Sequence, residues 1–207
     1  SHGYDEVVYI PMTSGLSSSC QTALILAADY DGRVQVVDNH QISVPLKNSV
    51  RDALALAEAG LPACEIKARL EEVGMDSLIY IGVDTLEYLK RGGRISPSIA
   101  MVGGLLSIKP VVAVRDGEVV LLGKARGSKN GNNLLVQTIE KTSGVDFSRP
   151  YRLGYTGLDD GLLQKYVADS AKLWQEHVDE LPVSTVGCAI GTHVGPGAIA
   201  VAFFQKS

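Results

Sequence analysis

Hydrophobic positions in the first third of the chain alternate between short apolar runs and helical stripes. Residues 6–10 and 34–37 are β-branched runs of strand length, and residues 21–29 between them predict a helix. Two helical stripes follow and are separated by Gly60-Leu61-Pro62; they are Leu46, Val50, Ala53, Leu54 and Ala57, then Ile66, Leu70 and Val73. Strands that alternate with helices favour a parallel sheet with helices on its faces.

The pattern changes near residue 78. Residues 78–83 predict a strand, residues 85–91 a short helix that ends at Gly92-Gly93, and residues 98–106 another helix. Two apolar runs, 110–114 and 118–122, then flank Asp116-Gly117. This dipeptide is typical of a tight hairpin in which both turn residues have positive φ. We therefore expect antiparallel pairing from this point on.

The last third predicts helices and strands in a mixed arrangement. We expect a helix over 131–141, a strand over 151–156, the longest amphipathic helix over 163–178, and strands over 185–190 and 198–204 around a glycine-rich loop. The predicted fold class is therefore α/β, with a parallel-sheet first domain at residues 1–78. A second α/β domain with a mixed or antiparallel sheet follows at residues 79–207.

Composition excludes several classes of protein. The 207 residues are 45% hydrophobic and 20% charged, which is typical of a soluble globular protein. No apolar run reaches the roughly 18 residues of a membrane span, and the first residues lack a signal-peptide pattern, so we expect a cytoplasmic protein without stable membrane insertion. Cys20, Cys64 and Cys188 lie far apart without CxxC spacing. This argues against disulfides or structural zinc and predicts small buried hydrophobes.

Charge is unevenly distributed along the chain. Residues 1–89 carry 5 basic and 13 acidic side chains, whereas residues 90–141 carry 9 basic and 3 acidic. A basic segment between acidic flanks favours an anionic ligand or an acidic partner, although a solvated surface would give the same pattern. The sequence pI of about 5.6 and the absence of aromatic residues from the basic segment argue against nucleic acid.

The first candidate site is the hydroxyl-rich loop Thr13–Ser19, between a predicted parallel strand and a helix. Ligands of such sheets bind beyond the carboxyl ends of the strands, where free N–H groups and hydroxyls suit a carboxylate or phosphate. Helix capping is the alternative, but it explains only one or two of the five hydroxyls. Gly15-Leu16-Ser17-Ser18-Ser19 lacks the second glycine of a nucleophile elbow.

The second candidate is the basic segment Lys90–Ser96. Its two glycines allow a sharp turn that frees Arg94 to direct its planar head at an oxyanion. Alternatively, Gly92-Gly93 only ends the helix, and Lys90 and Arg91 complement the helix dipole.

The third candidate is His193, within the glycine-rich loop. A lone histidine is more often structural, but three glycines and a proline nearby imply a close backbone approach to a ligand. His2, His40 and His177 have no comparable context, and His177 is expected at the surface.

Five motifs in one order resemble those of the DegV family and extend over nearly the whole chain. They are Thr13-Ser14-Gly15-Leu16-Ser17, residues 85–96, residues 104–110, Lys124-Ala125-Arg126-Gly127 and residues 192–198. The resemblance implies a fatty-acid-binding protein of two α/β domains with the EDD fold. The carboxylate would lie at the domain junction and the long acyl chain in an apolar tunnel.

The resemblance also implies residue roles and a partner. Ser17, with Thr13 and Ser14 in the same loop, would bind the carboxylate together with His193. Arg94 and Arg126 would face a fatty acid kinase or the phosphate, and the kinase would phosphorylate the bound fatty acid to an acyl-phosphate for phospholipid metabolism. No metal or other cofactor, and no catalytic residue, is implied.

Two departures from the family pattern stand out. The family usually has Leu-Ser-Gly-Thr where this chain has Leu16-Ser17-Ser18-Ser19, which predicts a stiffer or differently shaped loop around the head group. The family also has an additional N-terminal segment with a Thr-Ser-Gln-Pro motif whose Thr binds the carboxylate. This chain has no such motif and starts with Ser1-His2, which resembles a cloning remnant. We therefore expect an incomplete first domain with unpaired sheet edges that tends to associate.

Two other functions remain as alternatives. A lipid or ester hydrolase would use Ser17 as nucleophile, His193 as base and Asp38 or Asp84 to orient the base. A purely structural interaction domain would act through the basic segment and bind no lipid.

Overall fold

The computed structural model describes residues 3–74, 76–100 and 107–206. The chain divides into two compact units, Ser1–Ser77 and Leu78–Ser207. The first contains a two-stranded parallel sheet and the second a six-stranded mixed sheet. The predicted fold class, a small parallel sheet followed by a larger mixed one, is confirmed.

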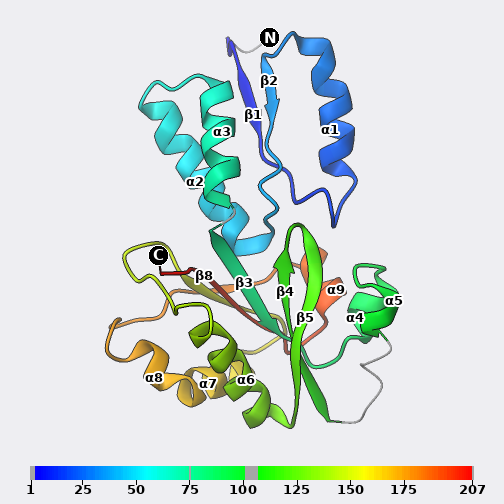
Figure 1. Ribbon diagram of the computed structural model, residues 1–207, viewed down its shortest axis with the longest axis vertical. Helices are drawn as coiled ribbons and strands as arrows, with labels where there is room; N and C mark the ends of the chain where they lie inside the picture. The colour runs from blue at the N-terminus through cyan, green and yellow to red at the C-terminus, as the bar shows by residue number, and fades with distance from the viewer. Residues whose placement is uncertain (1–2, 75, 101–106, 207) are drawn as a thin grey trace. The chain divides into compact units, whose positions relative to one another are not determined.

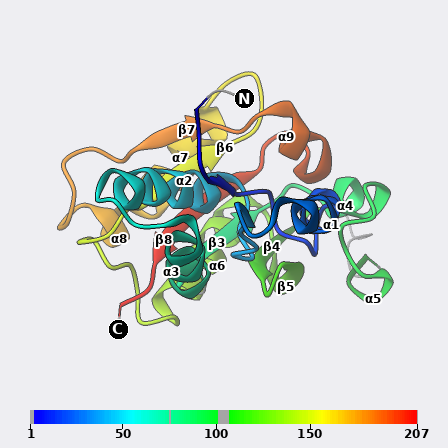
Figure 2. The ribbon, with the colours of Figure 1, turned by 90° about the horizontal axis from the view of Figure 1, so that it is seen from above.

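The first unit is a small α/β layer structure. One helix lies on one side of the strand pair, and two helices that pack side by side lie on the other (Figure 1 and Figure 2). Its elements are β1 (Val7–Tyr9), α1 (Ser19–Ala27) with the 3-10 turn η1 (Ala28–Tyr30), β2 (Val34–Val36), α2 (Ser43–Glu58) and α3 (Ala63–Gly74). The core cluster of this unit contains Val37, Ala53, Ile66 and Leu70.

The apolar stripe of α2 is only partly buried. Ala53 is in the core, but Val50 is 42% and Leu54 59% exposed, so the prediction of a buried stripe is wrong for both and for the exposed Ala57. The apolar face of α2 is wider than the contact it makes with α3. Val50 and Leu54 therefore line a groove, open to solvent, whose other walls include Val8 of β1.

The second unit is built on a sheet of strand order β5-β4-β3-β8-β6-β7. Neighbouring strands pair antiparallel in the β3–β4, β4–β5 and β6–β8 ladders, and β6 and β7 pair parallel. The strands are β3 (Ser77–Gly82), β4 (Ile108–Arg115), β5 (Glu118–Arg126), β6 (Arg152–Tyr155), β7 (Val183–Thr185) and β8 (Ile199–Phe204). The helices are α4 (Glu87–Arg91), α5 (Pro97–Ala100), α6 (Ser128–Glu140), α7 (Gly161–Asp169), α8 (Ala171–Trp174) and α9 (Cys188–Val194).

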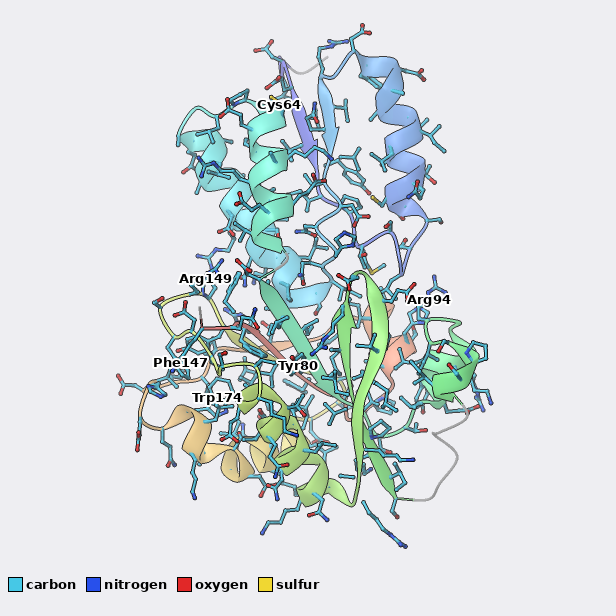
Figure 3. The ribbon with its side chains drawn as sticks, in the orientation of Figure 1. Cys64, Tyr80, Arg94, Phe147, Arg149 and Trp174 are labelled. Atoms are coloured by element: carbon cyan, nitrogen blue, oxygen red, sulfur yellow. The ribbon has the colours of Figure 1, made fainter. Side chains whose placement is uncertain are left out.

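The β4–β5 hairpin forms where the sequence predicts it. Asp116 and Gly117 have φ values of 50° and 79°, as a tight turn with two left-handed residues requires. Behind the sheet, Tyr80 of β3 meets Phe203 of β8 edge to face at 5.4 Å between ring centroids, and Trp174 is buried in the same core (Figure 3). Strands β3, β4, β6 and β8 therefore share one hydrophobic core, against which Val120 and Leu122 of β5 pack.

The prediction of one continuous helix over 163–178 is wrong, because the structure has two shorter helices there. The interruption lies at Ser170, where φ is −99° and ψ is 9°. The buried Ser170 Oγ donates to the carbonyl of Val167 at 3.4 Å and accepts from Trp174 Nε1 at 3.0 Å. This serine competes for backbone partners and breaks the helix into α7 and α8.

The predicted strand over 185–190 is also wrong. Strand β7 ends at Thr185 because it lies at the edge of the sheet in the described part of the chain and its ladder partner β6 ends at Tyr155. Helix α9 begins at Cys188, so His193 lies in the last helical turn and not in a loop. Of the helix predicted over 98–106, the first residues belong to α5, and residues 101–106 lie outside the described residues.

The cysteine prediction holds for one residue only. Cys20 is buried, whereas Cys64 and Cys188 are exposed, the first on α3 and the second at the start of α9. His177 is exposed, as expected, and stacks on Phe147 at 4.3 Å between ring centroids. Within the described ranges, no helix is long and apolar enough to cross a membrane.

Candidate functional site

Thr13 anchors the hydroxyl loop that follows β1. Its side chain is fully buried, its backbone N–H donates to the carbonyl of Gln41 at 3.1 Å, and its own carbonyl accepts from Leu16 and Ser17 at 3.1 and 3.2 Å. Its Oγ1 accepts from the N–H of Gly15 at 3.4 Å. Thr13 therefore shapes the loop from within.

Ser17 occupies the turn that leads into α1. Its Oγ donates to Ser19 Oγ at 3.0 Å and accepts from the N–H of Ser19 at 3.3 Å, whereas Ser18, the N-cap residue, makes no side-chain capping bond. One hydroxyl therefore holds the helix start, as the capping alternative expects. The half-buried Ser14 and the exposed Ser18 have no part in it.

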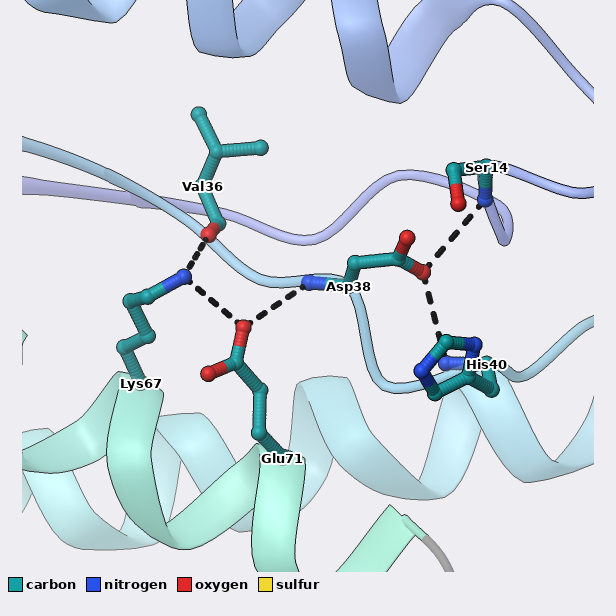
Figure 4. Close-up of polar contacts among 6 residues, drawn as sticks. All are labelled: Ser14, Val36, Asp38, His40, Lys67 and Glu71. Atoms are coloured by element: carbon teal, nitrogen blue, oxygen red, sulfur yellow. Dashed lines mark hydrogen bonds and ion pairs between the residues drawn. The ribbon is translucent and has the colours of Figure 1, made fainter. Parts of the chain in front are cut away.

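A second loop joins this one at the end of the parallel sheet, and of its residues the sequence indicates only Asp38, as the orienting acid of a hydrolase. It follows β2, and the Asp38 carboxylate accepts from the N–H of Ser14 and from that of His40, both at 3.4 Å (Figure 4). The carboxyl ends of adjacent parallel strands meet at one edge of a sheet, so the end of the run over 34–37 was the signal for this loop.

Asp38 is ionised in this setting. Burial raises the pKa of its carboxyl, but hydrogen bonds from Ser14 and from the backbone of His40 outweigh burial and leave the pKa below its ordinary value. Burial and the neighbouring Asp38 carboxylate raise the pKa of the Cys20 thiol, so this cysteine stays protonated.

A charged pair on α3 fixes the backbone of the second loop. Glu71 Oε1 accepts from the N–H of Asp38 at 3.2 Å and pairs with Lys67 Nζ at 2.7 Å (Figure 4). Lys67 Nζ also donates to the carbonyl of Val36, the last residue of β2. Lys67 and Glu71 therefore hold both the end of β2 and the backbone of the second loop in place.

In the second unit, the basic segment 90–96 forms a Schellman turn at the end of α4. The N–H of Arg94 donates to the carbonyl of Leu89 at 3.0 Å, and that of Gly93, with φ of 67°, donates to Lys90 at 3.0 Å. The exposed guanidinium of Arg94 donates from Nη1 to the carbonyl of Gly92 at 2.7 Å (Figure 3). The helix-end alternative thus explains the glycines, and Arg94 stays at the surface.

His193 packs against this turn from α9. A Cβ added to Gly92 would lie 2.1 Å from His193 Nδ1, and a Cβ added to Gly195 would lie 2.3 Å from the ring of Tyr88 on α4. Each glycine therefore admits a ring from the opposite helix. The structure brings the motifs of residues 85–96 and 192–198 into direct contact.

The Nδ1 atom of His193 is buried and has no hydrogen-bond partner among the described residues. Asp84, one of the two carboxylates that the hydrolase alternative assigns to it, pairs with Lys109 instead. Ser17 bonds Ser19, not an imidazole, in the first unit. These contacts give no support to a hydrolase.

Thr156, which the sequence analysis also missed, holds the glycine-rich turn that follows α9. Its buried Oγ1 donates to the carbonyl of Gly195 at 2.6 Å and accepts from the N–H of Ala198 at 2.9 Å. The N–H of Gly197 donates to the Thr156 carbonyl at 2.9 Å. A lone threonine at the end of a strand gives no signal in the sequence.

The predicted site residues thus form three groups. Thr13, Ser14 and Ser17 share one loop of the first unit, whereas His193 and Arg94 both adjoin Gly92 in the second. Arg126 is exposed at the end of β5, next to Gly127, which has φ of 81° and caps α6.

Comparison with known proteins gives a consistent result. The family model described as "Uncharacterised protein, DegV family" matches residues 1–206. A DegV domain-containing protein of Deinococcus radiodurans is 32% identical over 198 residues, which are 96% of this chain and 69% of the Deinococcus protein.

Solved structures agree in fold. One, described as fatty acid binding of a DegV family protein from Thermus thermophilus, is 30% identical with a TM-score of 0.80 and covers 98% of this chain and 71% of its own. Another is the fatty acid kinase B3 protein of Streptococcus pneumoniae loaded with linoleic acid, which is 18% identical with a TM-score of 0.79. The match covers 99% of this chain and 73% of the Streptococcus chain. The second likeness concerns the fold alone. The chain described here belongs to the DegV family.

Proposed function

We propose that this protein binds a long-chain fatty acid and does so as a carrier, not as an enzyme. The carboxylate of the ligand is held by the hydroxyl loop, with Ser17, Ser14 and Thr13, and by His193. The acyl chain occupies an apolar tunnel. The Thermus thermophilus relative, which is described as fatty acid binding, supports this ligand class.

The hydroxyl loop is the observation that carries the proposal. It lies beyond the carboxyl end of β1, where ligands of parallel sheets bind, and it precedes the start of α1. Ser17 Oγ accepts from the N–H of Ser19, and its hydroxyl proton, which points to Ser19 Oγ, can rotate toward an incoming anion. A hydroxyl-rich turn of this kind suits a carboxylate, which accepts several hydrogen bonds at once.

Burial of the acyl chain supplies the affinity and the head-group contacts supply the selectivity. Each methylene removed from water contributes about 0.8 kcal/mol. A long chain therefore offsets the several kcal/mol that association costs. The hydroxyls then distinguish a carboxylate from an uncharged end group.

A titration with oleate tests the head-group assignment. Ser17→Ala is expected to weaken oleate binding about tenfold, the effect of one lost hydrogen bond to a charged group. Ser18→Ala is the matched control, since Ser18 is an exposed hydroxyl of the same turn without a capping bond. Equal oleate affinities of the two variants would contradict the role of Ser17.

We further propose that the protein presents its fatty acid to a fatty acid kinase for acyl-phosphate formation. Arg94 and Arg126, both exposed in the basic part of the chain, face the kinase or the phosphate. Arg94→Ala is expected to leave oleate affinity unchanged and to lower acyl-phosphate formation by an added kinase. Loss of oleate binding with intact kinase docking would show that the roles are assigned wrongly.

A further inference from the structure

The loop after β2 contains a histidine in an unusual state. His40 has φ of 57°, a left-handed conformation that is uncommon for a residue other than glycine, and Ser43 has φ of 59°. The Nδ1 atom of His40 is buried and has no hydrogen-bond partner among the residues that the structure describes. A strained backbone and a buried polar atom without a hydrogen bond each lower the stability of the fold. Proteins retain such features mostly at binding sites, where a ligand interaction requires them.

The surroundings hold this conformation firmly. The N–H of His40 donates to the carboxylate of Asp38, and the N–H of Gln41 donates to Asn39 Oδ1 at 3.2 Å. Asn39 Nδ2 donates to Ser49 Oγ at 2.6 Å, and Gln41 Nε2 donates to the carbonyl of Ser77 at 2.9 Å. Asn39 and Gln41 are buried. The strain at His40 is thus maintained by its neighbours on both sides.

His40 lies next to the hydroxyl loop, and Asp38 connects the two. Asp38 binds the N–H groups of both Ser14 and His40, and Gln41 accepts from the buried Thr13. The imidazole lies beside the Asp38 carboxylate, on the side away from Lys67 and Glu71 (Figure 4). The two loops are therefore direct neighbours, joined by hydrogen bonds, at the end of the parallel sheet.

Charge gives this histidine a specific role. Lys67 already pairs with Glu71, so the negative charge of Asp38 is left to oppose an anion that approaches the hydroxyl loop. The imidazole of His40 places an N–H donor for that anion next to the Asp38 carboxylate.

We propose that His40 is a direct head-group ligand of this site: its imidazole binds the carboxylate of the fatty acid, and Asp38 is the positioning residue that joins the His40 loop to the hydroxyl loop. This inference rests on the proposed function, since it assigns a further residue to the same carboxylate.

The test compares two ligands with the same hydrocarbon chain and different head groups, oleate with its carboxylate and oleyl alcohol with an uncharged hydroxyl. His40→Asn removes the imidazole and keeps a residue that tolerates the left-handed backbone. His177→Asn, at an exposed histidine of the second unit, is the control. We expect His40→Asn to weaken oleate binding about tenfold, as loss of a hydrogen bond to a charged group does, and to leave binding of oleyl alcohol within twofold.

NMR of the unaltered protein gives a second readout that does not depend on a variant. Oleate is expected to shift the imidazole C–H signal of His40, assigned by its loss in His40→Asn, and oleyl alcohol is not. Oleate binding without a shift of this signal, and with equal affinity in His40→Asn, would overturn the role of His40 while fatty-acid binding stands. No binding of either ligand to the unaltered protein would overturn both proposals.

Discussion

His193 and Gly92 are in contact so close that only glycine fits at position 92. The Nδ1 atom of the histidine occupies the space of the missing side chain, at 2.1 Å from where a Cβ would lie. The carbonyl of Gly92 also accepts a hydrogen bond from the guanidinium of Arg94. One glycine thus adjoins both a proposed head-group ligand and a proposed kinase-facing residue.

The first prediction concerns this contact. Gly92→Ala forces the ring of His193 or the end of α4 to move, and we expect a loss of stability of about 1 to 3 kcal/mol, as for other overpacked sites. We also expect weaker oleate binding. Urea denaturation and an oleate titration measure the two effects.

Gly93→Ala is the control for Gly92→Ala. Nothing lies within 4 Å of a Cβ at Gly93, but its φ is 67°. The free energy of unfolding of this variant should fall by about 1 kcal/mol because of backbone strain, and its oleate affinity should be unchanged. If both variants bound oleate as the unaltered protein does, the contact would have no part in ligand binding.

The second prediction concerns the clamp at Thr156. Thr156→Val keeps the shape of the side chain but leaves the carbonyl of Gly195 and the N–H of Ala198 without this partner. We expect a loss of about 1 to 3 kcal/mol in the free energy of unfolding, because both groups are buried. Thr156→Ser retains the hydroxyl and should lose distinctly less. Equal losses in urea denaturation would mean that the methyl group, not the hydroxyl, matters.

The third prediction is a pH dependence. Because the pKa of Asp38 is lowered from 3.8 in the folded state, the folded protein binds fewer protons there than the unfolded chain. Its contribution to stability is complete above pH 3.8 and is lost as the pH falls through the lower, folded-state value. Asp38→Asn should therefore flatten the stability profile at acid pH in denaturation measured from about pH 5 down to about pH 2. A profile as steep as that of the unaltered protein would exclude Asp38 as a source of the slope.

The fourth prediction concerns the groove on α2. Val50 and Leu54 expose apolar surface there, and exposed apolar patches favour association. Leu54→Lys should reduce concentration-dependent association in sedimentation experiments and change stability by less than about 0.5 kcal/mol, as is usual for surface positions. Ala68→Lys, an exposed position on α3 outside the groove, is the control. Equal association of all three proteins would show that the groove takes no part.

The sequence predicts elements well where local chemistry dictates them. The Asp116-Gly117 turn and the helix end at Gly92-Gly93 follow from residues that tolerate positive φ, and both are confirmed. Prediction fails where a single buried hydrogen bond or the length of a neighbouring strand decides. The buried bond between Trp174 and Ser170 splits a periodic helix, and the short length of β6 ends β7 before residue 190.

The same distinction applies to the site. The hydroxyl loop is visible as a composition anomaly after a strand, whereas His40 looks ordinary in the sequence. Its significance depends on its left-handed backbone and on Asp38, whose carboxylate reaches Ser14, 24 positions earlier in the chain. The contact of His193 with Gly92 likewise joins motifs that are far apart in sequence, and spacing alone does not disclose it.

The most direct test of the account is to identify what the purified protein carries. Denaturing extraction of protein expressed in a bacterial host, followed by mass spectrometry, should recover long-chain fatty acid, and native spectra of delipidated protein should gain one oleate on addition of the ligand. Protein that carries no fatty acid and gains no oleate would contradict the central claim that this chain binds a fatty acid.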